Sequence, residues 1–351
     1  MPVEQLLQYV LVFGVAFGVA LIASPLVARL GHRLGLVDRP GGRRAHWGEV
    51  PRLGGVAIFA AFGAAVGVAA WWGMLTVGYS ADDFTRLVGL LVGGVGAFLF
   101  GLADDRFELS PRVQLICQFL LAFIAVGTLL WLERFTLPVL GLVALSDYPW
   151  GAWAYVPLTV LWMMGMMNTV NWLDGLDGLA AGVGTILCLV LAIHMHRVSQ
   201  PSVALLPIAL LGALLGFLPY NFAPARIFLG SAGAFFLGYG LGGLGLIAGG
   251  RVATALLVMG LPIVDVAWQI FDRVRHHRSP GQADRGHLHF RLLDLGLSER
   301  TIVLLYWSFC ALFGLLALMV SSRIYKLLAL VGVGVGVLAA LAWLSGRREE
   351  R

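Results

Sequence analysis

The stretch Asn168-Thr-Val-Asn-Trp-Leu-Asp-Gly-Leu-Asp-Gly-Leu-Ala-Ala-Gly182 lies between two long apolar runs. Its polar side chains recur at three-residue intervals, at Asn168, Asn171, Asp174 and Asp177. In a helix such positions lie on one side. Ionisable groups at the end of a spanning helix are costly and usually face a polar partner. The stretch therefore predicts two membrane helices that meet at a polar site.

The composition of the whole chain indicates a membrane protein. Hydrophobic residues make up 59% of the 351 residues, and charged residues only 12%, whereas a soluble domain has about 25% charged residues. The mean hydropathy is +0.87. Apolar runs of roughly 20 residues, long enough to cross a bilayer as helices, recur from end to end. They exclude a separate soluble domain and predict one all-α integral membrane domain over residues 1–351.

The apolar runs predict a polytopic protein of about 11 transmembrane helices, with 10 to 11 as the range. Their approximate bounds are 5–30, 53–73, 86–103, 113–132, 152–172, 176–195, 202–221, 231–249, 252–271, 301–321 and 325–345. The first run follows the acidic Glu4 instead of a basic segment. This favours a retained helix over a cleaved signal peptide.

The basic residues predict the orientation of these spans. One side of the membrane receives only six of the 24 Lys and Arg residues, namely Arg86, Arg134, Arg197, Arg251, Arg323 and Lys326. The positive-inside rule then places the N-terminus outside and the C-terminus in the cytoplasm. On the cytoplasmic side we expect one active site, built from segments 31–55, 101–112, 168–180, 220–233 and 272–300.

Two adjacent carboxylates, Asp104 and Asp105, end the third predicted span. Adjacent carboxylates repel each other, so both stay ionised only beside a cation, a metal or an arginine. The alternative is an ordinary solvated helix end, after which Ser110 and Pro111 start the next helix as its cap and first residue.

The two remaining polar segments suggest phosphate binding. The turn 220–233 leads into a helix whose backbone N–H groups could hold an anion, although it could also be a plain connector. The loop 272–300 contains six arginines, which are typical of contacts with phosphates or anionic lipids. Its His-x-His pair, His287 and His289, favours phosphate contact or proton transfer over a structural zinc site, because no cysteine lies nearby.

With these segments in order, the chain resembles the polyprenyl-phosphate N-acetylhexosamine-1-phosphate transferases. That family includes the enzymes that initiate O-antigen and teichoic acid synthesis and the translocase that makes lipid I. The resemblance covers about residues 31–297. It rests on D-R-P…R-R-x-H…P-R-L-G-G at 38–55, G-L-A-D-D-R at 101–106, N-x-V-N-W-L-D-G-L-D-G-L-A at 168–180, N-x-x-P-A at 221–225 and D-R-G-H-L-H at 284–289. The last motif looks more like the GlcNAc-1-phosphate branch than the lipid I enzyme.

The resemblance implies a reaction at the cytoplasmic face of the bacterial plasma membrane. A polyprenyl (undecaprenyl) phosphate would attack the β-phosphorus of a UDP-N-acetylhexosamine, most simply UDP-GlcNAc, with Mg²⁺ or Mn²⁺ as cofactor. The products would be a lipid-linked sugar diphosphate and UMP. Such transfer depends mainly on positioning and on neutralising oxygen charge. No nucleic acid partner is expected, and small-residue helix faces would suit a homodimer.

The resemblance also assigns roles to single residues. Asp104 and Asp105 would serve the lipid phosphate and deprotonation, and Asp174 would act with Asn171 at the pyrophosphate and metal. The other assignments are Asp177 and Asn221 at the uridine, Phe228 on the uracil ring, His287 and His289 at the sugar or phosphates, and Arg43, Arg44, His46 and Arg285 at phosphates.

The chain departs from the family pattern at three positions. The family reads M-G-D-x-G-S where this chain has Leu229-Gly-Ser-Ala-Gly-Ala234, so Ser231 replaces a metal-binding aspartate. A hydroxyl can join a Mg²⁺ shell but brings no charge. Phe290 replaces the last histidine of H-x-H-H, and Arg44 replaces a usual lysine, which changes the geometry of its contacts. Ser231 therefore has three possible explanations: an active enzyme in which other residues compensate for the missing carboxylate, a relative that has lost catalysis, or a substitution introduced on purpose.

Two other classes of protein fit part of the pattern. A transporter of an anionic or lipid-linked substrate would also place acids and arginines among many helices, but such sites usually lie near the bilayer midplane. A non-catalytic homologue that binds polyprenyl phosphate is favoured by Ser231 and Phe290, whereas the retained acids oppose it. Because the polar segments gather at one face, the sequence favours the enzyme.

Overall fold

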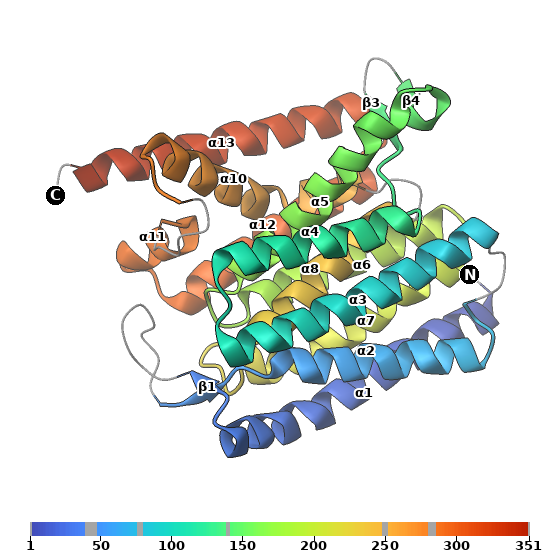
Figure 1. Cartoon of the computed structure of the whole chain (residues 1–351), viewed down its shortest axis with the longest axis horizontal. Helices are drawn as coiled ribbons and strands as arrows, with labels where there is room; N and C mark the ends of the chain where they lie inside the picture. The colour runs from blue at the N-terminus through green and yellow to red at the C-terminus, as the bar shows by residue number, and fades with distance from the viewer. Residues whose placement is uncertain are drawn as a thin grey trace.

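The computed structural model describes residues 2–38, 48–75, 80–137, 141–247, 252–279 and 286–349. They form a bundle of long helices (Figure 1). The helices are α1 (Val3–Leu34), α2 (Gly54–Trp71), α3 (Ala81–Phe107), α4 (Pro111–Gly127), α5 (Gly151–Leu173), α6 (Leu179–Arg197), α7 (Pro201–Asn221), α8 (Gly230–Ile247), α9 (Val252–Val258), α10 (Gly260–Arg275), α11 (Leu288–Asp294), α12 (Glu299–Met319) and α13 (Arg323–Glu349).

Each predicted apolar run corresponds to a helix, except that the run 252–271 forms two helices, α9 and α10, with a bend of 81° between them. By length and composition, seven of the described helices can span a membrane: α1, α2, α3, α6, α7, α8 and α12. The bent pair would make eight, and α4 and residues 324–339 of α13 are shorter apolar helices. The all-α class is confirmed, while the count of eleven spans stays a prediction.

The helices run side by side along the long axis of the molecule in Figure 1. Helix α1 begins at the right end of the bundle, whereas α13 ends at the left, the end at which α11 and β1 also lie. The two ends of the chain therefore lie at opposite ends of the bundle. Which side of a membrane each end faces stays a prediction.

Two short antiparallel hairpins lie in the connections between helices, although the sequence predicts no strands. β1 (Val37–Asp38) pairs with β2 (Val50–Pro51), and β3 (Arg134–Leu137) pairs with β4 (Gly141–Ala144), which a short 3₁₀ turn, Leu145–Asp147, follows. Outside the hydrocarbon region, water can satisfy the open strand edges. The first hairpin matters for the site, because Pro51 accepts a hydrogen bond of 2.8 Å from the backbone N–H of Phe228, just before α8.

Glycines permit the closest helix contacts, as expected for membrane helices packed through small residues. A Cβ atom at Gly212 of α7 would come within 2.6 Å of the backbone oxygen of Phe13 in α1. At Gly101 of α3, a Cβ atom would meet the backbone of Ser231 and Ala232 in α8. This close approach places the last turn of α3 directly against the first turn of α8.

Candidate active site

The polar segments meet at the end of the bundle where α3 ends and α8 begins. The backbone N–H groups of Gly54 and Gly55 donate to the carbonyl oxygens of Phe228 and Leu229, at 2.9 and 2.8 Å. The guanidinium of Arg300, at the start of α12, donates to the carbonyl oxygen of Ala223 at 2.8 Å. The turn 220–229 is thus held from two sides, by the loop before α2 and by α12.

Asp104 is buried at the end of α3 and does not belong to a solvated helix end. Its carboxylate accepts the backbone N–H of Leu109 at 3.1 Å and the side-chain amide of Gln114 at 2.8 Å. Gln114 belongs to α4, which begins at Pro111 with Ser110 as its N-cap, as predicted. Asp104 therefore joins α3 to α4. Its predicted role toward a lipid phosphate stays a prediction.

Asp105 caps α8 from another helix. One carboxylate oxygen accepts the backbone N–H of Ser231 at 2.8 Å, and the other accepts that of Ala232 at 2.9 Å. A negative charge at a helix N-terminus is favourable, because the first N–H groups lack partners within the helix. The anion at these two N–H groups is therefore a carboxylate of the chain itself.

Gly230, just before Ser231, is required for this arrangement. Its φ of +73° lies in the left-handed region, and a Cβ atom there would collide with the carbonyl oxygen of Arg52. Only glycine combines this backbone conformation with this close approach at little cost. Ser231 itself is half-buried, and its predicted place in a metal shell stays a prediction.

The loop 174–178 joins α5 to α6 and carries two of the predicted aspartates. Asp177 is held at both ends: its backbone N–H donates to Glu299 at 2.7 Å, and its carboxylate accepts the N–H of Ala225 at 2.7 Å. Gly178, with a φ of +80°, precedes the first residue of α6. Asp174 and Asn171 are half-buried where α5 ends, so they lie at the junction of both helices.

Asn168 has a different role from the other polar residues of this stretch. Its side-chain amide donates to Gln118 of α4 at 2.6 Å, and the amide of Gln118 donates back at 3.2 Å. This reciprocal pair lies between α4 and α5, and Gln118 is only 1% exposed. The polar face predicted for residues 168–177 is thus divided between helix packing and the site.

Asn221 and Phe228 frame the turn before α8. Asn221 is buried, and its amide donates to the carbonyl oxygen of Ile227 at 3.1 Å, which closes the turn. Phe228 is half-buried and bonds through its backbone to the loop before α2. Their predicted contacts with uridine stay predictions.

A second group of polar residues comes from α10 and the loop before α11. Asp265 lies 3.0 Å from Nδ1 of His287, and Gln269 donates to the carbonyl oxygen of Gly286 at 2.6 Å. Arg273 lies over the ring of Trp172, with its guanidinium carbon 5.0 Å from the ring centroid. The sequence analysis missed Asp265 and Gln269. A carboxylate inside the predicted span 252–271 could have indicated a polar site, because a charge within a membrane span is costly and is usually functional.

His289 is buried and stacks on His287, with 5.5 Å between their ring centroids. Among the described residues, neither of its ring nitrogens has a hydrogen-bond partner. Burial lowers the pKa of His289 to about 3, so the ring stays neutral near pH 7. Its Nε2 would lie 2.7 Å from a Cβ atom at Gly175, and the ring of Phe290 lies beside it there. Both rings therefore cover the loop 174–178.

Four predicted phosphate-binding residues lie outside the described residues: Arg43, Arg44, His46 and Arg285. A polar cavity of about 470 Å³ next to Asp105 does contain basic side chains. Arg52 and Arg106 line it together with Asp38 and Glu108, and Arg52 is ion-paired with Asp38. Asp105 lines it as well, and Arg52 is also ion-paired with Glu108 at 3.7 Å, so acids and bases balance closely in this cavity.

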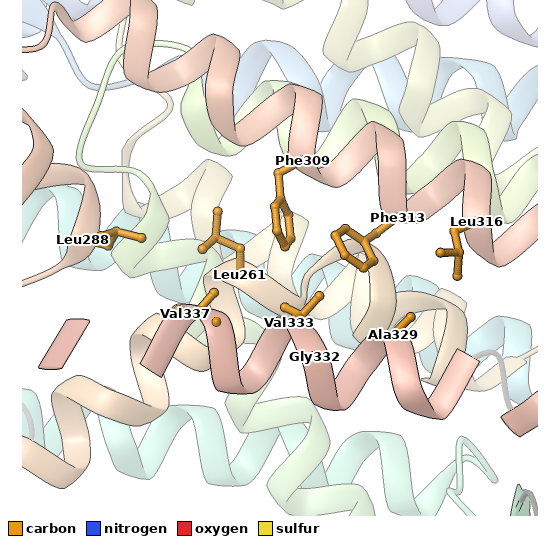
Figure 2. Close-up of a pocket in the computed structure, with 10 residues that line it drawn as sticks. Leu261, Leu288, Phe309, Phe313, Leu316, Ala329, Gly332, Val333 and Val337 are labelled. Atoms are coloured by element: carbon orange, nitrogen blue, oxygen red, sulfur yellow. The ribbon is translucent and has the colours of Figure 1, made fainter. Parts of the chain in front are cut away.

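A second cavity, of about 520 Å³, is wholly apolar in its side chains (Figure 2). It lies between α12 and α13, where Phe309 and Phe313 face Val333 and Val337. Leu288, beside the two histidines, also lines it. Its lining suits hydrocarbon and offers no group for chemistry.

The residues at the site could supply only part of the ligands that a magnesium ion needs. Among the described residues, no group of three or more His, Cys, Asp or Glu side chains could hold a metal. Mg²⁺, however, is commonly held by one or two carboxylates together with substrate phosphates and water. Asp174, Asn171 and the hydroxyl of Ser231 are donors of that kind by residue type, and their role as a metal shell stays a prediction.

Comparison with known proteins shows which sequences are similar. Residues 87–249 match the sequence profile described as Glycosyl transferase family 4. The chain is 32% identical to the probable undecaprenyl-phosphate N-acetylglucosaminyl 1-phosphate transferase of Bacillus subtilis (strain 168), over 99% of this chain and 95% of that protein. It is 31% identical to the decaprenyl-phosphate N-acetylglucosaminephosphotransferase of Mycobacterium tuberculosis (strain ATCC 25618 / H37Rv), over 92% and 85%. It is 33% identical to the phospho-N-acetylmuramoyl-pentapeptide-transferase of Desulforudis audaxviator (strain MP104C), over 84% and 92%.

Proposed function

The chain belongs to glycosyl transferase family 4, and on this basis we propose that it transfers N-acetylglucosamine 1-phosphate from UDP-GlcNAc to a polyprenyl phosphate. The observation that carries the proposal is the similarity to the Bacillus subtilis protein along nearly the whole chain. The name of that relative supplies the acceptor class and the sugar. The proposed product starts a cell-envelope glycan.

The proposed reaction exchanges one phosphoanhydride bond for another. An oxygen of the polyprenyl phosphate attacks the β-phosphorus of UDP-GlcNAc, the bond from that phosphorus to the bridging oxygen breaks, and UMP leaves. This transfer needs positioning and charge neutralisation more than covalent help. The end of α5 and the start of α6, which meet at the loop 174–178, support the positioning of the substrates. Arg106, which lines the polar cavity next to Asp105, supports the charge neutralisation.

We propose Asp174 and Asn171 as the residues that hold Mg²⁺, with Ser231 as a weaker third ligand. When bound, the ion would neutralise charge on the diphosphate oxygens. Asp105 and Asp177 then act mainly by holding α8 and the turn 220–229 in place, since their carboxylates accept backbone N–H groups. The site would open to the cytoplasm, as the distribution of basic residues indicates.

The proposal is tested by UMP release from purified protein in lipid nanodiscs. Undecaprenyl phosphate, UDP-GlcNAc and Mg²⁺ should yield UMP and a lipid-linked product, and omission of any of the three should stop the reaction. UDP-GalNAc and UDP-glucose show how selective the site is for the sugar. A parallel measurement of thermal stabilisation by UMP shows whether nucleotide binds at all.

Ser231 favours a second candidate, a homologue with impaired catalysis that still binds its ligands. It would be stabilised by UMP or UDP-GlcNAc but would release no UMP. A transporter would be stabilised by another anionic solute and not by uridine nucleotides. The gathering of the polar residues at one end of the bundle, instead of at its middle, speaks against transport.

A further inference from the structure

One face of α10 carries three buried polar side chains at four-residue spacing: Asp265, Gln269 and Arg273. Residues four apart lie above one another on a helix. A buried carboxylate is costly unless it is paired or hydrogen-bonded. Gln269 and Arg273 contact Gly286 and Trp172, respectively, on either side of the site. These three side chains of α10 therefore point toward the candidate site and not toward lipid.

Asp265 binds the imidazole of His287 with one carboxylate oxygen and the backbone of the next residue with the other. Oδ2 lies 3.0 Å from Nδ1 of His287, and Oδ1 accepts the backbone N–H of Leu288 at 2.9 Å. An ionised carboxylate can only accept hydrogen bonds, so the proton of the imidazole must lie on Nδ1. Two bonds from one carboxylate fix both the tautomer and the orientation of the ring.

The other ring nitrogen of His287 is left for a different contact. Among the described residues, Nε2 of His287 has no hydrogen-bond partner. The ring lies 5.5 Å from the ring of Trp172, two residues before Asp174. His289, in contrast, has no hydrogen bond to a carboxylate among the described residues and is only 1% exposed. Of the two histidines, only His287 has one nitrogen anchored and the other available.

We infer that Asp265 is a positioning residue for the proposed transfer reaction, which acts by holding His287 with its proton on Nδ1. Nε2 then meets the substrate at the end of α5. It can accept a proton there or, once protonated, donate a hydrogen bond to a phosphate oxygen. The inference rests on the proposed function, because it assigns His287 to that reaction.

The variant Asp265→Asn tests this role with little change of volume. An amide can donate to Nδ1, which moves the proton to Nε2, as happens when the aspartate of a serine protease triad is replaced. We expect kcat for UMP release to fall by about 10- to 100-fold, the usual effect of removing a carboxylate behind a functional histidine. KM for UDP-GlcNAc should change little. Asp265→Glu keeps an acceptor for Nδ1–H and should recover part of the loss.

Two measurements separate positioning from plain support of the loop. The ¹⁵N shifts of the imidazole nitrogens, assigned through His287→Gln, report the tautomer directly; we expect Nδ1–H in the unchanged chain and Nε2–H in Asp265→Asn. The control variant Gln269→Ala removes an anchor of Gly286 while Arg291 still donates to the same oxygen at 2.5 Å. It should keep the Nδ1–H tautomer.

The inference is overturned if the unchanged chain shows the Nε2–H tautomer, or if Asp265→Asn keeps its kcat. It is also overturned if Gln269→Ala and Asp265→Asn lower kcat equally with the tautomer unchanged, since Asp265 would then only support the loop. Absence of UMP release from the unchanged chain is a separate result. It overturns the proposed function, while the ¹⁵N shifts still report whether Asp265 controls the ring.

Discussion

Two helices begin at the site, α6 and α8, and each has a glycine in the left-handed region at its start: Gly178 just before α6 and Gly230 as the first residue of α8. Before α6, the acids belong to the same stretch of chain, Asp174 and Asp177. Before α8, the local residue is Ser231, and Asp105 of α3 supplies the carboxylate. The N-terminus of α8 thus receives a negative group from a distant part of the chain, whereas the Asp177 carboxylate before α6 accepts the backbone N–H of Ala225 in another segment.

This difference indicates how the work of the site is divided. At α8, the first free N–H groups are used by Asp105, so this helix start serves to hold the fold together. At α6, Asp177 binds the backbone of the turn 220–229, and Asp174 lies at the end of α5 beside it. We therefore assign the metal and diphosphate to the α6 side of the site.

The largest expected effect is that of Asp174→Asn. If the α6 side holds the metal, losing this charge should lower UMP release by at least ~100-fold, or about 2.7 kcal/mol of barrier. The matched control is Asp177→Asn, whose amide oxygen can still accept the N–H of Ala225 and which should lose less. Equal activity of Asp174→Asn and the unchanged chain, over a range of Mg²⁺ concentrations, would remove Asp174 from the metal site.

The variant Asp105→Ala should mainly destabilise the protein. It leaves the N–H groups of Ser231 and Ala232 without their acceptor, and an unsatisfied buried donor costs about 1–3 kcal/mol. Thermal unfolding in detergent should shift down for Asp105→Ala but not for Glu108→Ala, whose side chain is 82% exposed on the same helix end. An unchanged unfolding temperature with lost activity would instead assign Asp105 to the chemistry.

The variant Ser231→Asp places a carboxylate at the start of α8 and so makes the two helix starts more alike. If Ser231 belongs to the metal shell, the Mg²⁺ concentration for half-maximal UMP release should fall about tenfold, equivalent to 1.4 kcal/mol. Ser231→Ala provides the comparison without a ligand. No gain from the aspartate would exclude position 231 from the metal shell.

The smallest expected effect concerns Glu299 of α12, which holds the loop before α6 by accepting the backbone N–H of Asp177. Glu299→Ala removes the acceptor for the backbone N–H of Asp177, a hydrogen bond worth about 1 kcal/mol. Glu299→Gln keeps an acceptor oxygen and should behave almost like the unchanged chain. Hydrogen exchange of the loop 174–178 should rise for alanine only; equal exchange in both variants would mean that this bond does not order the loop.

The long helices could be predicted from the sequence because apolar length alone determines them: each predicted run from 5–30 to 325–345 overlaps a helix. The short helix α11 was not predicted, because it lies inside the polar loop 272–300. The bend between α9 and α10 was missed, since the apolar composition continues across it. The strands β1 and β2 were missed for a different reason. They are two residues each, and their pairing depends on the turn before α8, which is distant in sequence.

The sequence predicted which residues belong to the site, but it did not predict which groups they contact. The stretch 168–182 indicated a polar junction, yet nothing local revealed that Asn168 pairs with Gln118 of α4. Asp105 and Asp265 bind groups that lie 126 and 22 residues away in the chain. Such partners are chosen by the packing of whole helices, which motif spacing does not encode.

The pair of Asn168 and Gln118 has a consequence for the rotation of α5 about its own axis. Two reciprocal hydrogen bonds between amides exist at one rotational setting only. Turning α5 by a single residue, about 100°, would break both bonds and carry Asn171 away from the side on which it now lies. In a low-dielectric surrounding, two unpaired amides are costly. The pair thus fixes the rotation of α5 about its axis from inside the bundle, and with it the direction in which the polar end of α5 points.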